Sequence, residues 1–270
     1  MTSKSIVGIR FQQAGKIHYY DPEGMELAAG DLVTVQTKYG LKVGRVTIAP
    51  KQVISNEITE PLPSVLRKAT PEDIEQSKDA AKREQEAYSL CKELVTKHAL
   101  DMKVIGAESN LTGDQFIVYF TAPAKVDFRK LARELASRLR AKIEIRQVGP
   151  RDATKIIGGM GRCGAPLCCA TFLTEFSPVS VKMAKEQNVS LDPMKNSGAC
   201  GRLLCCLGYE SSHYHDTTKR LPRHGQHVQT SSGGGKVVVV NVLRETVTVQ
   251  LEDNTIVEIP CAELIAQQLP

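Results

Sequence analysis

The sequence contains the same nine-residue phrase twice, as GRCGAPLCC at residues 161–169 and as GACGRLLCC at residues 198–206. Both copies fit the pattern Gly-x-Cys-Gly-x-x-Leu-Cys-Cys. Together they hold six of the eight cysteines of the chain: Cys163, Cys168, Cys169, Cys200, Cys205 and Cys206. Because a Cys-x4-Cys-Cys spacing recurs within so short a span, these thiols are predicted to share one chemical task.

The N-terminal residues indicate which thiol chemistry to expect. Residues 1–5, MTSKS, lead directly into a strand-like alternation and contain no apolar segment of a secretory signal. The longest aliphatic run, residues 237–240, is far too short to span a bilayer. We therefore expect a cytoplasmic protein without membrane insertion. In a reducing compartment, clustered thiols are more often metal ligands or redox groups than structural disulfides.

Iron–sulfur clusters and zinc are the two metal groups that thiolates usually hold, with four ligands to a site. The chain has no Cys-x2-Cys pair of the kind that clamps zinc, and its wider spacing is closer to a loop that wraps a cluster. Glycines beside each leading cysteine allow the backbone to turn tightly. The pattern predicts an iron–sulfur cluster, with zinc as the alternative.

Counting ligands leaves two arrangements open. Three thiols in each copy are one short of four, so the two copies share a site or a partner protein supplies the missing ligand. We expect one cysteine of each adjacent pair to ligate and the other to pack or to serve a neighbouring site. His213 and His215 are weak candidates for completing a zinc site. A thiol redox enzyme is disfavoured, because the sequence shows neither Cys-x2-Cys nor a clear general base.

Periodicity and turn residues divide the chain into four parts and predict an α+β fold. Residues 1–62 are expected to form a β-rich N-terminal unit. Residues 63–157 are expected to form an α-β-β-α-β layer whose helices cover one face of a sheet. Residues 158–210 make the cysteine-rich insert. Residues 211–270 begin irregularly and are then expected to form a small SH3-like β-barrel.

Two helices are expected in the second part. The first spans about residues 71–98, with Thr70 as its N-cap and Pro71 in the first turn. Cys91 lies on its apolar stripe and is expected to pack in a core, as is the isolated Cys261. The second helix follows Asp127, which is expected to cap it.

The net charge of +5 is unevenly distributed. Residues 125–162 carry eleven Lys and Arg against four Asp and Glu. The excess fits either a solvated basic helix face or an RNA-binding surface on Arg129, Lys130 and Arg133. RNA sites usually add stacking aromatic side chains, and only Phe128 is nearby, on the side expected to be buried. This favours the solvated face.

The chain resembles the YaaT/RicT family, bacterial proteins of the polymerase-suppressor C-terminal-domain class. The resemblance runs along nearly the whole chain and includes both cysteine phrases. Its other phrases are residues 7–11 with Gly15 and Lys16, residues 100–103, 116–121, 126–129, 143–149, 151–152, 178–185 and 221–222. The chain departs from the family pattern at Ala165 and Pro166, where Arg-Met is expected.

The resemblance implies a regulatory subunit in the cytoplasm and no enzymatic activity. It implies a complex with two small helical proteins, YlbF-like and YmcA-like, that carries iron–sulfur clusters, expected to be of the 4Fe–4S type. It further implies an influence on mRNA processing by the endoribonuclease RNase Y. In spore formers it also implies an effect on sporulation, competence and biofilm formation. By position, the implied ligands are the six cysteines of the two phrases.

Overall fold

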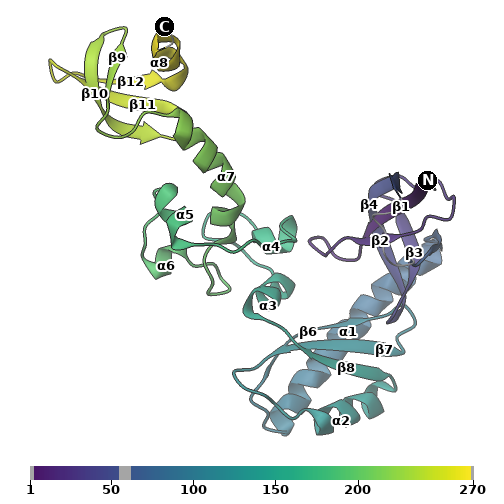
Figure 1. Cartoon of the computed structure of the whole chain (residues 1–270). Coiled ribbons are helices and arrows are strands. Elements are labelled where there is room, and N and C mark those ends of the chain that lie inside the picture. The colour runs from purple at the N-terminus through teal and green to yellow at the C-terminus, as the bar shows by residue number, and fades with distance from the viewer. Residues whose placement is uncertain (1–2, 55–61, 269–270) are drawn as a thin grey trace. The chain divides into compact units, whose positions relative to one another are not determined.

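The computed structural model describes residues 3–54 and 62–268. The chain divides into two compact units, which are described separately here (Figure 1). The first unit comprises residues 1–175 together with residues 199–201, and the second comprises residues 176–198 and 202–270. The structure confirms the predicted α+β fold.

The first unit begins with a five-stranded antiparallel sheet in the order β2-β1-β4-β3-β5. The strands are β1 (Ser3–Arg10), β2 (His18–Tyr20), β3 (Leu32–Thr37), β4 (Gly40–Ile54) and β5 (Val65–Lys68). Alternating apolar residues face a core around Val7, Ile9, Val33 and Val46. Gly40 starts β4 at φ 100°, a conformation that glycine adopts without strain and that lets the chain reverse after β3. The structure thus forms the β-rich N-terminal unit that the alternation predicts.

The second layer of this unit follows the predicted α-β-β-α-β order. It contains α1 (Pro71–Lys97), β6 (Lys103–Ser109), β7 (Gln115–Thr121), α2 (Arg129–Leu139) and β8 (Lys142–Gln147). The sheet order is β6-β7-β8, with β7 and β8 parallel and joined by α2. Leu94 of α1 and Leu131 of α2 pack with Val118 and Phe120 of β7 in one core. Both helices therefore cover the same face of the sheet.

The N-terminus of α1 has the capping chemistry that the sequence predicts. Thr70 accepts a hydrogen bond from the backbone N–H of Asp73, and Asp73 accepts one from the backbone N–H of Thr70. The second helix begins one residue later than predicted. Phe128 is the N-cap of α2 and makes no side-chain capping bond, while the Asp127 carboxylate accepts from the N–H of Arg129.

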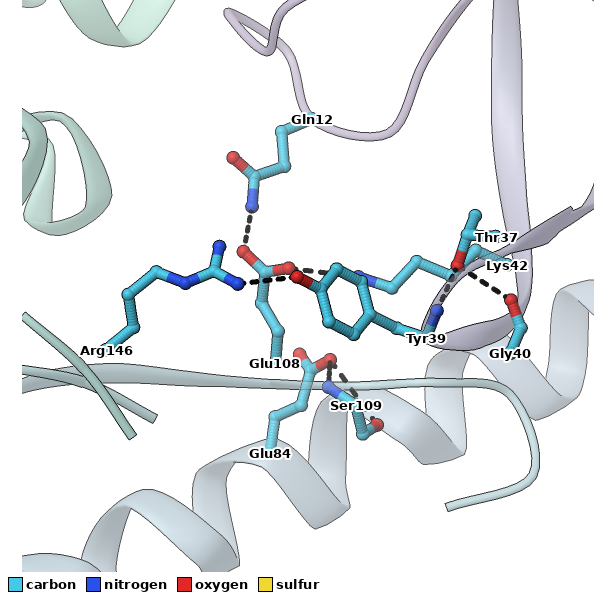
Figure 2. A network of polar contacts seen from close by, with 9 residues as sticks. All are labelled: Gln12, Thr37, Tyr39, Gly40, Lys42, Glu84, Glu108, Ser109 and Arg146. Atoms are coloured by element: carbon cyan, nitrogen blue, oxygen red, sulfur yellow. Dashed lines mark hydrogen bonds and ion pairs between the residues drawn. The ribbon is translucent and has the colours of Figure 1, made fainter. Parts of the chain in front are cut away.

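Polar contacts join the first sheet of this unit to its second layer (Figure 2). Lys42 of β4 forms an ion pair of 3.0 Å with Glu108 of β6, and Gln12 donates to the same carboxylate. Arg146 of β8 donates to the hydroxyl of Tyr39, in the turn between β3 and β4, at 2.6 Å. These contacts connect the first sheet and its loops to both outer strands of the second sheet. The first unit ends with α3 (Pro150–Ile157) and α4 (Cys168–Thr171).

The second unit contains three helices followed by an antiparallel sheet. The elements are α5 (Val181–Glu186), α6 (Pro193–Asn196), α7 (Cys205–Arg220), β9 (His227–Thr230), β10 (Gly233–Asn241), β11 (Thr246–Leu251), β12 (Ile256–Pro260) and α8 (Cys261–Gln268). Residues 211–220, expected to be irregular, are helical and belong to α7.

The sheet of the second unit differs from the expected SH3-like barrel. Its strands pair only with their sequence neighbours, in the open order β12-β11-β10-β9, and no pairing closes the sheet among the described residues. Leu264 of α8 is 2% exposed and joins the core formed by Val237, Val247 and Ile259. Helix α8 therefore supplies apolar cover that a closed barrel would take from another strand.

Candidate functional site: the paired cysteine motifs

The two cysteine phrases adopt the same local backbone structure. In the first, the N–H of Gly161 donates to the carbonyl of Ala165 at 2.7 Å, and Met160 forms a β-bridge with Pro166. In the second, Gly198 donates to Arg202 at 2.8 Å, and a bridge joins the equivalent pair, Ser197 and Leu203. Pro166 at the departure from the family pattern is accommodated, because its position is bridged in both copies. The sequence repeat is therefore a structural repeat.

Glycine is required at one position of each repeat for conformational reasons. Gly164 has φ 80° and Gly201 has φ 75°, both in the left-handed region that other residues rarely adopt. A Cβ atom at either glycine meets no atom within 4 Å, so space does not restrict these positions. The glycine turns the chain directly after the leading cysteine, Cys163 or Cys200, which places that cysteine in the tight turn of its repeat.

The adjacent cysteines of each repeat open a helix. Leu167 precedes α4 with φ −55° and ψ 127°, and Leu204 precedes α7 with φ −55° and ψ 124°. Backbone bonds from Leu167 to Gly159 and from Leu204 to Asn196 fix the two starts in the same way. The two adjacent cysteines of each repeat therefore occupy the same position relative to their helix.

The six thiols differ in exposure. Cys163 is exposed, Cys169 is buried, and the other four are intermediate. Burial is the main cause that raises the pKa of Cys169, and the thiols of Cys200 and Cys168 add to it by charge repulsion. Cys200 therefore lies near Cys169 and Cys168, and residues 199–201 group with the first unit. Cys205 and Cys206 belong to the second unit.

The thiols suit an iron–sulfur cluster or zinc in their chemistry, since both take thiolate ligands. Their arrangement is less complete. Among residues 3–54 and 62–268, no three His, Cys, Asp or Glu side chains form a group that could hold a metal ion. Within the first unit, the structure brings Cys200 near the adjacent pair Cys168 and Cys169.

His213 and His215 do not complete a metal site with the thiols of their own unit. Both are exposed side chains of α7, eight and ten residues beyond Cys205. A rise of about 1.5 Å per residue places His213 about 12 Å along the helix axis from Cys205. The helical conformation of a segment expected to be irregular separates these groups.

The remaining two cysteines lie in cores, as predicted. Cys91 is fully buried in α1, and burial raises its pKa to about 11. Cys261 is 3% exposed and packs beside Leu221 and Val242. Both thiols behave as apolar packing groups.

The predicted basic face is exposed on α2. Arg129, Lys130 and Arg133 point away from the buried Leu131 and Leu135. Arg129 forms an ion pair with Asp127, whose pKa falls to about 2 because Arg129 donates to its carboxylate. The structure therefore places the three cations together on a solvated surface, partly neutralised by one acid.

A polar cleft in the first unit was not found by sequence reasoning. It lies where β2, β3 and β4 approach the three strands β6, β7 and β8, and it includes Gln12, Tyr39, Lys42, Glu108 and Arg146 (Figure 2). These residues are far apart in the sequence and belong to no motif. His18 of β2 lines the same cleft.

Two family models and one curated relative match the chain. Residues 63–148 match the family described as PSP1 C-terminal conserved region, and residues 178–221 match the PSP1-like protein, third domain. The chain is 42% identical over 247 residues to the stage 0 sporulation protein YaaT of Bacillus subtilis (strain 168), with 92% of this chain and 90% of that protein covered. The chain belongs to the YaaT/RicT family.

The two matched regions correspond to separate parts of the fold. The first match runs from the end of the first sheet through β8, and the second runs from the residues before α5 to the end of α7. No solved structure matches the chain. None of the described helices combines the length and apolar character needed to cross a membrane.

Proposed function

We propose that this chain is a non-enzymatic regulatory subunit that binds iron–sulfur clusters through its paired cysteine motifs. The observation that carries the proposal is the structural repeat, in which two separate segments present a cysteine in a tight turn and two cysteines at a helix start. Packing alone does not require this repeat, because the buried thiols Cys91 and Cys261 pack without any such motif.

The proposed cofactor is of the 4Fe–4S type. The ligand set is Cys163, Cys168, Cys169, Cys200, Cys205 and Cys206, with Cys169 assigned mainly to packing because it is the buried member of its pair. Since each repeat offers fewer than four accessible thiols, the proposal includes ligands from partner proteins, namely the YlbF-like and YmcA-like helical proteins. Bound by these thiolates, a cluster would supply a redox-active centre.

The proposed biological role is the control of mRNA processing by RNase Y and, in a spore former, of sporulation, competence and biofilm formation. Support comes from the similarity to a relative named as a stage 0 sporulation protein.

The test is quantification of iron, sulfide and zinc in the chain purified anaerobically with its partners. The expected result is a brown protein that contains iron and sulfide in equal amounts. Cys163→Ser and Cys200→Ser, one from each repeat, are expected to lower the iron content. Cys261→Ala is the matched control, because this cysteine lies outside the repeats and is expected to leave the iron content unchanged. A colourless complex with stoichiometric zinc contradicts the proposal.

A zinc-stabilised RNA-binding module is the second candidate function. It is favoured by the exposed cations Arg129, Lys130 and Arg133 on α2. This candidate requires RNA binding that weakens steeply with salt and falls when the three side chains are neutralised together. It is rejected if RNA does not bind at low salt or if the triple neutralisation has no effect.

A further inference from the structure

Three cavities adjoin one another in the first unit, and no residue of the cysteine motifs lines them. Their volumes are about 530, 230 and 740 Å³. Phe11 and Gln12 line all three, and Lys42 and Glu108 line the first two. The three adjoining cavities are here called the basic groove.

The groove is strongly cationic. Lys16, Lys38, Lys42 and Arg146 line its first cavity. Arg10, Arg45 and Lys78 line its third cavity. Only two acids, Glu84 and Glu108, line any of the three cavities.

Two of these cations are paired. Lys42 forms an ion pair with Glu108, which also accepts from Gln12, and Arg146 forms one with Glu144. Glu84 accepts from the backbone N–H of Ser109 at 2.7 Å, and burial raises its pKa (Figure 2).

Several of the cations have no anionic partner. Lys16, Arg45 and Lys78 form no ion pair with any residue that the structure describes. The buried Nε atom of Arg10 likewise lacks a hydrogen-bond partner among the described residues. Unpaired cations in two adjoining cavities create a positive potential that attracts a polyanion.

Two aromatic rings line the first cavity together with Lys16. Phe11 and His18 contact each other with ring centroids 5.5 Å apart, and His18 is exposed. Partial desolvation and then the charge of Lys16 lower the pKa of His18, which favours the neutral ring. A neutral ring beside unpaired cations suits a base and its phosphate, which an acidic peptide does not provide.

We propose that the basic groove binds single-stranded RNA, with backbone phosphates on its cations and a base against Phe11 and His18. The unpaired cations lie in two of the cavities, Lys16 in the first and Arg45 and Lys78 in the third, which favours a strand of several nucleotides over a free mononucleotide. The choice of RNA over other single strands rests on the proposed role in mRNA processing. The surface is separate from the cationic face of α2.

The test is fluorescence anisotropy of a labelled, unstructured RNA of about 12 nucleotides. The complete chain is titrated at about 50 mM and about 200 mM salt. The iron content of the same sample is measured separately, so a failure of RNA binding and a failure of cluster binding are distinguished. Wild type is expected to bind at low salt and to weaken steeply at high salt.

The decisive variant combines Lys16→Gln, Arg45→Gln and Lys78→Gln. Since each single-strand phosphate contact contributes about 0.7 to the logarithmic salt dependence, the slope is expected to fall by about 2, with an affinity loss of at least about tenfold at low salt. The matched control combines Lys92→Gln, Lys219→Gln and Arg244→Gln, which removes the same charge from exposed positions outside the groove. It is expected to bind with nearly wild-type affinity.

Two further measurements complete the test. His18→Ala is expected to weaken binding about fivefold through lost stacking, with an unchanged circular dichroism spectrum. Adenosine monophosphate and polyglutamate, supplied at equal anionic charge, are expected to compete poorly. The proposal is overturned by absent binding at low salt, by equal loss in the groove and control variants, or by a competitor as effective as RNA. It is also overturned if only neutralisation of Arg129, Lys130 and Arg133 abolishes binding.

Discussion

Asp73 makes more contacts than its place in the first turn of α1 requires. Its carboxylate accepts from the N–H of Thr70, from the hydroxyl of the buried Thr34 at 3.1 Å and from Arg67 at 2.7 Å. The side chain thus joins the first sheet to the second layer of its unit. Its position among buried groups makes each lost bond costly.

Asp73→Ala is expected to lower the free energy of unfolding by about 2–3 kcal/mol, since it removes half of the capping box and leaves the Thr34 hydroxyl without its acceptor. Urea denaturation of the complete chain measures the change. Asp79→Ala is the matched control, because this exposed carboxylate on the same helix pairs only with Lys82. The control is expected to cost less than about 0.5 kcal/mol, and equal effects in the two variants contradict the prediction.

The same residue sets a pH dependence. The hydrogen bonds from Thr70 and Thr34 and the charge of Arg67 hold the pKa of Asp73 below its ordinary value. The stabilisation is therefore present above the unfolded pKa, which is about 3.9, and is lost as the pH falls through the lower folded value. The stability difference between wild type and Asp73→Asn is expected to be largest near neutral pH and to shrink below about pH 4. A difference that is constant from pH 6 to pH 3, roughly the range over which the carboxyl titrates, contradicts this.

Single residues differ in how far their sequence context predicts their role. Cys91 lies on a helical stripe and is buried as predicted, because the periodicity alone specifies its side. Arg146 was counted in a basic segment and actually donates to Tyr39, 107 positions away in the sequence. No local pattern specifies such a contact, so the basic groove became visible only in the folded chain.

Helices, like single residues, could be predicted only where a local pattern specifies them. The N-terminus of α1 was predicted correctly because Thr70 and Pro71 form a cap with a local mechanism. Most of α7 was predicted as irregular because its sequence, CCLGYESSHYHDTTKR, is polar and only Leu207 and Thr217 are buried. A helix that buries so little leaves almost no apolar period in its sequence.

The sheet of the second unit yields an element-scale prediction about α8. Because Leu264 completes the core of an open sheet, Leu264→Ala is expected to lower the stability of this unit by about 2–4 kcal/mol. Leu243→Ala is the control, since Leu243 is 66% exposed in the turn between β10 and β11. Thermal unfolding followed by far-ultraviolet circular dichroism measures both. If Leu264→Ala behaves like the control, α8 does not stabilise the sheet.

At the scale of the whole molecule, the sequence predicted the α+β fold class and the order of the elements. It did not predict whether the C-terminal sheet closes into a barrel. Alternation and capping residues specify the five-stranded sheet and the α-β-β-α-β layer, since each is built from neighbouring segments. The cysteine repeat was recognised from its spacing, and the structure adds that both copies have the same backbone bonds. The barrel was wrong because closure depends on long-range pairing, which the alternation of four strands does not specify.

The separate cores of the two units lead to a prediction about unfolding of the whole chain. Clusters around Val33 and Leu94 lie in the first unit, and the cluster around Val247 lies in the second. We expect calorimetry to resolve two transitions, because units with their own cores unfold independently when few contacts couple them. Asp73→Ala is expected to lower only one midpoint and Leu264→Ala only the other, each on the order of 10 °C. If both substitutions shift one common transition, the units unfold together. The second cysteine repeat is then the first candidate for the coupling, because residues 199–201 group with the first unit while the residues on either side of them belong to the second.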